Sequence, residues 1–282
     1  MKKQKGFSLV ELMVSLVLGL VVTAAAFQMF LMNQQTFSLQ QATSQLEEDG
    51  QLILRYLKRD LRRAGGTSRA GMNQATNSCD VPSTSHALGI VTEDVVCNGQ
   101  TYLASARNNK DQDRLTLTFS AFNDGRQTNA NRVIADCQGS VVTLQANQWV
   151  RVVNTYFVDG GSLRCRGSLS GGSASVELLT GVDGFQVLYG IANAAGPEAF
   201  VQRYRNADDI STTDRIMSVR LAVLLRAESH SFRMDKTDKT DKKPTIRYLL
   251  DAEFEEKSLE VPAIWRQFVT TIQMRNALAT AN

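Results

Sequence analysis

The sequence predicts an α+β fold, in which one long N-terminal helix packs by its second half on a body of mainly antiparallel β-strands. Two observations predict it. An apolar run at residues 7–32 continues directly into a polar segment that keeps helical periodicity. Short β-branched segments separated by turn residues then follow from residue 115 onward. With 282 residues, 43% of them apolar, the chain is long enough to bury a sizeable core.

The apolar run at residues 7–32 contains one formally charged side chain, Glu11. As a helix with a rise of about 1.5 Å per residue, the run can cross a hydrocarbon core of roughly 30 Å. Lys2, Lys3 and Lys5 precede it without an acid, so the N-terminus is expected in the cytoplasm and the remainder of the chain outside. Inserting a carboxylate into hydrocarbon costs roughly 2.5 to 3.5 kcal/mol of free energy. The presence of Glu11 in the apolar run therefore has to be explained.

Two simple explanations of this segment are an ordinary secretory signal and a plain membrane anchor. The alanines at residues 24–26 offer a signal peptidase small side chains, but the apolar run continues beyond them through residues 27–32. An acid near the start of a signal core is also unfavourable. In a plain anchor, Glu11 would be tolerated near the membrane interface.

The string KGFSLVEL at residues 5–12 resembles the cleavage and methylation signature of type IV prepilins and of the related pseudopilins. The resemblance implies that a prepilin peptidase cuts after Gly6, that the new amino group of Phe7 is methylated, and that the helix is retained. The ammonium group of Phe7 then supplies the cation that Glu11 lacks, with Glu11 of an incoming subunit docking on Phe7 of a neighbour. Because Glu11 lies four positions after Phe7, it could instead neutralise its own terminus.

Beyond the apolar run, hydrophobic residues at spacings of three, four and seven extend the helix to about residue 64. These residues are Phe37, Leu46, Ile53, Leu54, Leu57, Leu61 and Ala64. The polar face is acidic at residues 47–49 and basic at residues 58–63, where cations complement the negative end of the helix dipole. Gly65 and Gly66 predict the helix end. Gly19 and Gly50 lie inside the helix and are either flexing points or locally tolerated glycines.

Four cysteines, Cys79, Cys97, Cys137 and Cys165, are widely spaced and contain no CxxC pair of the kind found in zinc or redox sites. In an oxidising compartment they allow three pairings. The sequential pairing, Cys79 with Cys97 and Cys137 with Cys165, is favoured because it closes the nearest neighbours. In a cytosolic body they would instead be buried free thiols.

The body is expected to begin with a long, partly irregular connection at residues 65–113, pinned by a disulfide, and to continue as an antiparallel sheet packed against the helix. Expected strands lie at residues 115–119, 141–144, 149–153, 156–158, 176–179, 185–189, 219–225, 247–254 and 268–274. Turns are expected at residues 123–125 and 159–161. The mixed-charge run at residues 233–243 predicts a hairpin tip and lacks the ligand pattern of a calcium loop.

Composition argues against several classes of function. Removing the three leader lysines leaves 28 basic residues against 28 acidic ones, so bulk charge gives no support to a nucleic-acid partner. His86 and His230 form no ligand-spaced pair, residues 167–171 miss the GxSxG pattern by one position, and no phosphate-binding glycine loop follows a strand. We therefore expect no enzymatic activity, no cofactor and no metal site.

Three later motifs narrow the resemblance: RDLRRAG at residues 59–65, GVDGFQVLYG at residues 181–190 and FVTTIQMRN at residues 268–276. In this order they resemble the PilW group of minor pilins, to which the J-type pseudopilins of type II secretion are related. The resemblance implies a pilin-like fold with a cytoplasmic leader at residues 1–6, a long helix at residues 7–64 whose part 7–32 spans the membrane, and a periplasmic β-rich body at residues 65–282.

The function implied is that of a minor pilin, which joins other minor pilins in a complex that primes or caps a type IV pilus. The alternatives are a J-type pseudopilin, and a tip adhesin or DNA-uptake pilin. Implied partners are other minor pilins, the major pilin, prepilin peptidase and the inner-membrane assembly platform, while a nucleic-acid partner is not expected. The protein would reside in the inner membrane as a single-pass protein and then in the pilus fibre, at or near its tip.

Overall fold

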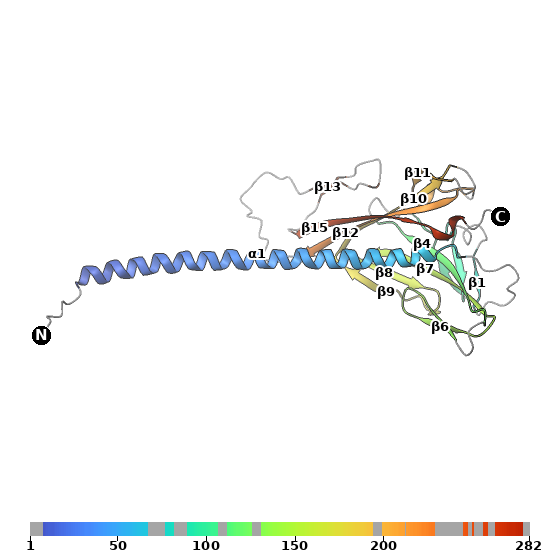
Figure 1. Cartoon of the computed structure of the whole chain (residues 1–282), viewed down its shortest axis with the longest axis horizontal. Coiled ribbons are helices and arrows are strands. Elements are labelled where there is room, and N and C mark those ends of the chain that lie inside the picture. The colour runs from blue at the N-terminus through green and yellow to red at the C-terminus, as the bar shows by residue number, and fades with distance from the viewer. Residues whose placement is uncertain are drawn as a thin grey trace.

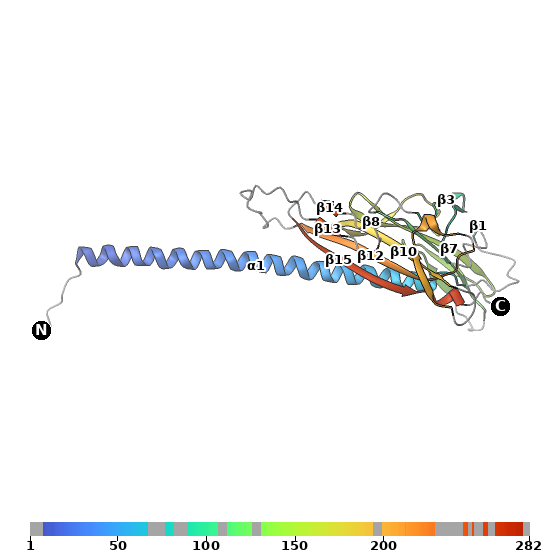
Figure 2. The same ribbon diagram turned by 90° about the horizontal axis from the view of Figure 1, so that it is seen from above.

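The computed structural model describes residues 8–66, 77–81, 89–106, 112–125, 131–193, 199–211, 213–228, 245–247, 250, 256–258 and 263–278. One continuous helix, α1 (Leu9–Arg63), forms a rod whose second half carries the body and whose first half projects from it (Figures 1 and 2). The predicted fold class, a long helix packed on antiparallel strands, is confirmed.

The second half of α1 packs on the body through the apolar stripe that the sequence predicts. Leu46, Ile53, Leu57, Leu61 and Ala64 are all buried. Phe37, expected on the same stripe, is 68% exposed. The expectation for Phe37 was wrong because it lies on the part of the rod that projects beyond the body, where helical spacing alone buries nothing.

Gly50 is neither a flexing point nor a tolerated oddity, because the body packs directly against it. A Cβ atom on Gly50 would lie 2.4 Å from the ring of Phe268. The missing side chain therefore lets an aromatic ring from the end of the chain lie against the helix backbone. At Gly19, on the projecting half, a Cβ would meet nothing within 4 Å.

The first sheet contains β4 (Leu115–Phe122), β7 (Trp149–Asp159), β8 (Ser162–Gly167) and β9 (Val176–Thr180), in the order β4-β7-β8-β9 with all pairs antiparallel. The turn expected at residues 159–161 joins β7 to β8, and Gly160 and Gly161 adopt the positive φ angles of 58° and 76° that it needs. The two strands expected at 149–153 and 156–158 are one strand. Asn154 and Thr155 continue the pairing between them and are buried rather than exposed as a break.

The second sheet contains β10 (Val182–Ala192), β11 (Val201–Arg205), β12 (Ile216–Glu228) and β15 (Ala263–Gln273), in the order β11-β10-β12-β15 and again antiparallel. Within the described residues, the body therefore has two four-stranded sheets where a single sheet was expected. One core joins both sheets to the helix, with Leu57 from α1, Tyr156 from the first sheet and Phe185 from the second in the same cluster.

Smaller elements complete the described part of the body. They are β1 (Cys79–Asp80), β2 (Val95–Cys97) and β3 (Gln100–Tyr102) in one small sheet, the pair β5 (Arg132–Ala135) and β6 (Val141–Leu144), the pair β13 (Thr245–Arg247) and β14 (Glu256–Ser258), and the short helices η1 (Ala207–Asp209) and η2 (Arg275–Leu278). The described part of the region at 65–113 thus contains short strands beside irregular segments, which agrees with the partly irregular connection that was expected. Strands of two or three residues are too short to show a periodicity in sequence.

Two expectations lie mostly or wholly outside the described residues. Of the strand expected at 247–254, residue 247 belongs to β13 and residue 250 is a bend, whereas the other six residues are not described. The hairpin tip expected at 233–243 is not described at all. The strand expected at 268–274 begins earlier, at Ala263, and ends at Gln273.

The structure joins Cys79 to Cys97 and Cys137 to Cys165, which is the sequential pairing. The first disulfide connects β1 to β2 in the small sheet. The second connects the turn after β5 to β8 of the first sheet. The first disulfide therefore lies within the small sheet, the second fastens a turn to the first sheet, and neither involves the helix.

Candidate functional site

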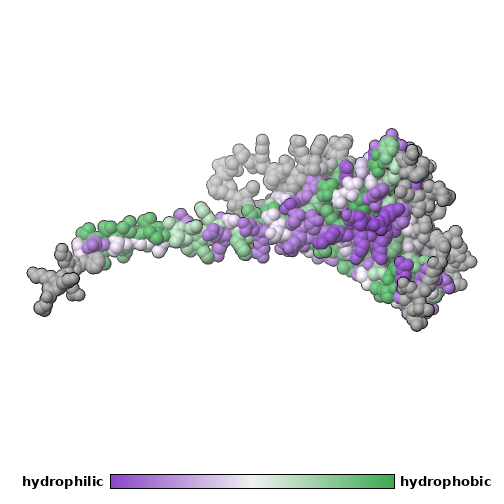
Figure 3. Space-filling view, viewed as in Figure 1, coloured by the Kyte–Doolittle hydropathy of each residue, from purple (hydrophilic) through white to green (hydrophobic). Residues whose placement is uncertain are grey.

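The projecting half of α1 is an apolar rod with no cover from its own body. Every residue from 8 to 37 is exposed. Its sixteen large apolar side chains between Leu9 and Met32 are 42% to 73% exposed, and Figure 3 shows apolar residues gathered along this half. Among the described residues, α1 is the one helix that is long and apolar enough to cross a membrane. A surface of this extent is unfavourable in water and marks a contact with lipid or protein.

Two hydroxyl side chains within the apolar half, those of Ser15 and Thr23, donate hydrogen bonds to the backbone of the same helix. The hydroxyl of Ser15 donates a hydrogen bond to the carbonyl of Leu12 at 2.9 Å. The hydroxyl of Thr23 donates to the carbonyls of Gly19 and Leu20, at 3.0 and 2.9 Å. These hydroxyls need no water, which suits a helix that is surrounded by hydrocarbon or by other apolar helices.

Glu11 lies in the first turn of α1. The helix starts after Ser8, whose carbonyl accepts the amides of Glu11 and Leu12 at 3.1 and 3.2 Å. A carboxylate in this turn interacts favourably with the positive end of the helix dipole. No residue in the described part of the chain forms an ion pair with Glu11. Gly6 and Phe7, the predicted cleavage and methylation residues, lie outside the described residues, so their roles and that of Glu11 stay predictions.

A buried polar network fixes the other end of the rod to the body. Asp60 is 2% exposed and accepts hydrogen bonds from the hydroxyl of Tyr156 at 2.5 Å and from the amide of Asn154 at 2.8 Å, both on β7. Burial and the Asp60 carboxylate raise the pKa of Tyr156 well above its ordinary value, so Tyr156 stays a neutral donor. The network ties the last turns of α1 to the middle of the first sheet.

The same network reaches the second disulfide. Asn154 accepts a hydrogen bond from the backbone amide of Cys137 at 3.1 Å, and the hydroxyl of Tyr56 donates to the carbonyl of Cys137 at 2.7 Å. The rod is therefore attached to a turn that the Cys137–Cys165 disulfide already holds to β8. Sequence reasoning missed Asp60. The available signal was a carboxylate placed three residues after Leu57, next to the apolar stripe.

The C-terminal segment closes the end of the helix. The amide of Asn276 donates hydrogen bonds to the carbonyls of Arg63 and Ala64, at 3.3 and 2.9 Å. Gly65 has a φ of 69° and donates its amide to Thr118 on β4 at 3.0 Å. Carbonyls at a helix end have no partner within the helix, and Asn276 satisfies two of them. The sequence motifs at residues 59–65 and 268–276 are thus in contact at the end of α1.

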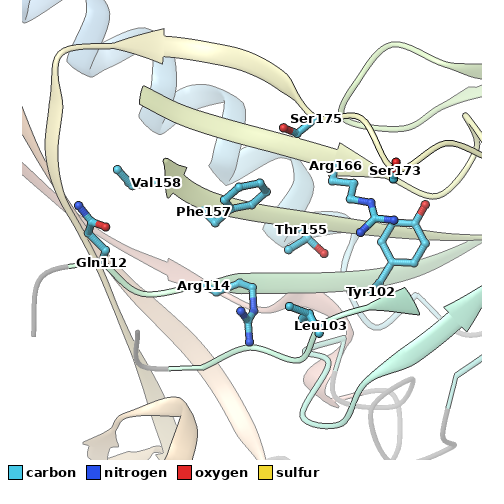
Figure 4. Close-up of a pocket in the computed structure, with 10 residues that line it drawn as sticks. All are labelled: Tyr102, Leu103, Gln112, Arg114, Thr155, Phe157, Val158, Arg166, Ser173 and Ser175. Carbon is cyan, nitrogen blue, oxygen red and sulfur yellow. The ribbon is translucent and has the colours of Figure 1, made fainter. Parts of the chain in front are cut away.

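The outer side of the first sheet holds an open cleft of about 470 Å³ (Figure 4). Arg166 stacks on the ring of Tyr102, with 4.7 Å between guanidinium carbon and ring centre, and donates to the carbonyl of Thr101 at 3.1 Å. Arg114 turns away from this pair and donates to the carbonyl of Ala104 at 2.7 Å. The two arginines do not converge on a common point, and each instead binds backbone of the segment at 101–104 on the outside of the sheet.

Two family models and one solved structure are similar to parts of this chain. A family model described as "Type IV Pilus-assembly protein W" matches residues 151–276, and a model described as "Prokaryotic N-terminal methylation motif" matches residues 1–27. No curated protein matches the chain. Among solved structures, the type IV-like pilin TTHA1219 from Thermus thermophilus is similar with 14% sequence identity and a TM-score of 0.41, over 82% of this chain and 98% of that one.

The two matched regions contain the first half of the rod and the residues that bind its last turns. The methylation motif covers most of the apolar half. The other model begins within β7, includes Tyr156, which donates to Asp60 of the helix, and ends at Asn276, which caps the helix. The apolar half of the helix and the strands that contact its last turns are thus both matched, and the two matches support a type IV minor pilin of the PilW type.

Proposed function

We propose that this minor pilin joins other minor pilins in a complex that primes or caps a type IV pilus. The observation that carries the proposal is the uncovered apolar half of α1. Burying a large apolar side chain is worth roughly 1.5 to 3 kcal/mol, so moving the sixteen side chains of this half from lipid into water would cost tens of kcal/mol. The rod leaves the bilayer at low cost only if other apolar helices surround it.

A bundle of such rods supplies that surrounding. Head-to-tail contacts that do not close on themselves generate a helical filament rather than a ring. The body at residues 65–282 is bulky, and a body of this size repeated along a shaft is harder to pack than one placed once, at an end. Its size thus favours a minor subunit of a priming or capping complex.

Processing would prepare the rod for this assembly. A prepilin peptidase would cut after Gly6 and leave Phe7 with a methylated amino group, and the match of the methylation motif to residues 1–27 supports this step. Glu11 of the incoming subunit would then meet the Phe7 ammonium group of a neighbour. A charge buried in hydrocarbon is costly without a partner, so this pairing would draw each subunit into register.

The location follows from the same features. The leader at residues 1–6 would remain in the cytoplasm, the part at 7–32 of the helix at 7–64 would span the inner membrane, and the body would lie in the periplasm, a compartment in which disulfides persist. From there the protein would enter the fibre at or near its tip. Its partners would be other minor pilins, the major pilin, prepilin peptidase and the assembly platform.

Deletion of the gene, followed by counting of surface pili, tests the proposal. We expect pili to be lost or sharply reduced, to return with the wild-type chain, and not to return with Glu11→Lys. Normal piliation in the deletion strain would contradict the priming role. Normal pili with lost adhesion or DNA uptake would favour a tip adhesin or uptake pilin, and intact pili with lost protein secretion would favour a J-type pseudopilin.

A further inference from the structure

The second half of α1 turns a basic surface away from its own body. Arg55, Lys58 and Arg62 are exposed, whereas Leu57 and Leu61 between them are buried against the sheets. Figure 3 shows hydrophilic residues gathered where the rod crosses the body. From residue 51 to residue 63 the helix contains one acid, Asp60, and that acid is buried. This side of the rod is therefore strongly positive.

A fourth cation joins this surface from the end of the chain. Arg275, at the start of η2, lines a groove of about 470 Å³ together with Lys58 and Arg62. The groove runs between α1 and the end of β15, and Thr271 and Gln273 also line it. No acidic side chain is among its lining residues. We call Arg55, Lys58, Arg62 and Arg275 the basic face.

The charges of the basic face are not neutralised within the described part of the chain. None of its four residues forms an ion pair with a described residue, whereas Arg59 and Arg63 lie 3.5 and 4.0 Å from Asp60. Lys58 and Arg62 also stand four positions apart on a helix, where like charges destabilise it. The isolated subunit thus bears a repulsion that an external anion would relieve.

We propose that the basic face binds an acidic surface on a neighbouring pilin subunit. The inference rests on the proposed function, because packing of the apolar halves is what brings a neighbour alongside. The apolar half and the basic face belong to one continuous rod (Figures 1 and 2). Rods that pack side by side in their first halves also stand side by side in their second halves, and a neighbour can approach only the side that the subunit's own body leaves free.

The position of the basic face excludes an anionic lipid surface as its partner. Arg55 lies 23 residues beyond Met32, which is about 35 Å along a helix. Electrostatic attraction is screened over about 8 Å at physiological ionic strength. A nucleic-acid duplex, for its part, would have to enter between subunits whose rods already pack together. A neighbouring subunit is brought to this side by the assembly itself.

The two halves of the rod then have different tasks. The apolar half supplies most of the association energy but is non-directional and distinguishes poorly between one apolar helix and another. Complementary charge selects partners and register, because a neighbour with like charge at this place is rejected. The basic face would thus decide which pilin stands beside this subunit.

Pairwise co-purification tests the proposal. The full-length chain is coexpressed with each pilin of the same organism that carries the methylation motif, solubilised in mild detergent, and the amount of each partner retained is measured. We compare wild type, Arg62→Glu, Lys58→Glu with Arg62→Glu, and the conservative Arg62→Lys. Arg203→Glu on β11 is the matched control, because Arg203 is exposed and its side chain has no hydrogen-bond or ion-pair partner among the described residues.

We expect at least one pilin to be retained by wild type, Arg62→Lys and Arg203→Glu, and about tenfold less of it by the doubly reversed variant. Raising the salt from 0.15 M to about 1 M shortens the screening length from about 8 to about 3 Å and should weaken the wild-type complex. Reversing an acid to lysine on the partner should restore binding to the doubly reversed variant. Cooperative thermal unfolding at a temperature close to that of the wild type establishes that each variant is folded.

Two other results would overturn the inference. If Glu11→Lys abolishes retention while the doubly reversed variant binds as wild type does, the rods assemble but the basic face does not select the neighbour, and the proposed function stands without it. If the doubly reversed variant retains its pilin partner but loses binding to a short DNA duplex, measured by fluorescence anisotropy, the face belongs to nucleic acid. Retention of no pilin by the wild type would refute both proposals.

Discussion

Removing one oxygen atom from the buried network should separate its contribution from that of the apolar stripe. The change is Tyr156→Phe, which keeps the ring and its edge-on contact with Tyr56 at 6.4 Å but removes the hydroxyl that donates to Asp60. Asp60 then remains buried with the amide of Asn154 as its neutral donor. The matched control is Tyr56→Phe, which removes a hydroxyl that donates to an uncharged backbone carbonyl.

The expected magnitudes follow from the charge of the two acceptors. A hydrogen bond to a charged group contributes about 1.5 to 3 kcal/mol, and one between neutral groups about 0.5 to 1.5 kcal/mol. Tyr156 and Asp60 are both almost fully excluded from water, whereas Tyr56 is half-buried, which places the first bond toward the upper limit and the second toward the lower. We expect Tyr156→Phe to lower the free energy of unfolding by about 2 to 3 kcal/mol and Tyr56→Phe by about 1 kcal/mol.

Urea unfolding of the full-length chain in detergent, followed by the fluorescence of Trp149 and Trp265, measures both values. A cycle that combines Tyr156→Phe with Asp60→Asn isolates the coupling between the two side chains. If Tyr156→Phe costs no more than Tyr56→Phe, or if the coupling is near zero, the charged bond does not hold the rod, and the attachment is due to apolar packing alone.

Three further predictions concern other parts of the chain. Gly50→Ala should destabilise the body by about 1 to 3 kcal/mol by overpacking against Phe268, although alanine favours a helix by about 1 kcal/mol; Gly19→Ala, which meets nothing, is its control, and thermal unfolding measures both. Burial raises the pKa of Asp136 despite three backbone amides that donate to it, so its contribution to stability is greatest in acid and falls as pH rises through that raised pKa. The unfolding free energy of wild type relative to Asp136→Asn should therefore increase as the pH is lowered from 7 toward 4, and a constant difference would contradict this. Intact-mass analysis of the mature chain should show that it begins at Phe7 with one added methyl group, and any other N-terminus would contradict the processing.

Local features of the sequence predict much of this fold because they are governed by local physics. The helix is visible in its periodicity, the turn at 159–161 in its glycines, and the core strands in their β-branched residues. Assignment of those strands to two sheets depends on pairing between distant segments, such as Phe185 with Val223 and Val223 with Phe268, to which no local signal corresponds. The expectation of a single sheet failed at that step.

Residues that fix the body to the rod were missed for a related reason. From the sequence alone, Gly50 only lowers helix propensity. Its role is visible once Phe268, far along the chain, is seen to pack against it. From the sequence alone, Asn154 predicts a break between two strands. In the structure it lies within one strand and donates a hydrogen bond to Asp60. In each case the residue type is unfavourable locally and favourable only in a contact between distant segments, and local propensity cannot register such a contact.

These same contacts explain how a rod with a repeating apolar stripe keeps one register on its body. The stripe of Ile53, Leu57 and Leu61 repeats every four residues, so a slip of about one helical turn, roughly 5.4 Å, would bury similar side chains. This half of the helix has one glycine, Gly50, against Phe268 and one buried carboxylate, Asp60. In a slipped helix, a side chain would clash with Phe268, and the Asp60 carboxylate would lose its hydrogen-bond donors and be buried unpaired. Apolar burial thus holds the rod to the body, and these two locally unfavourable residues determine where along the rod the body sits.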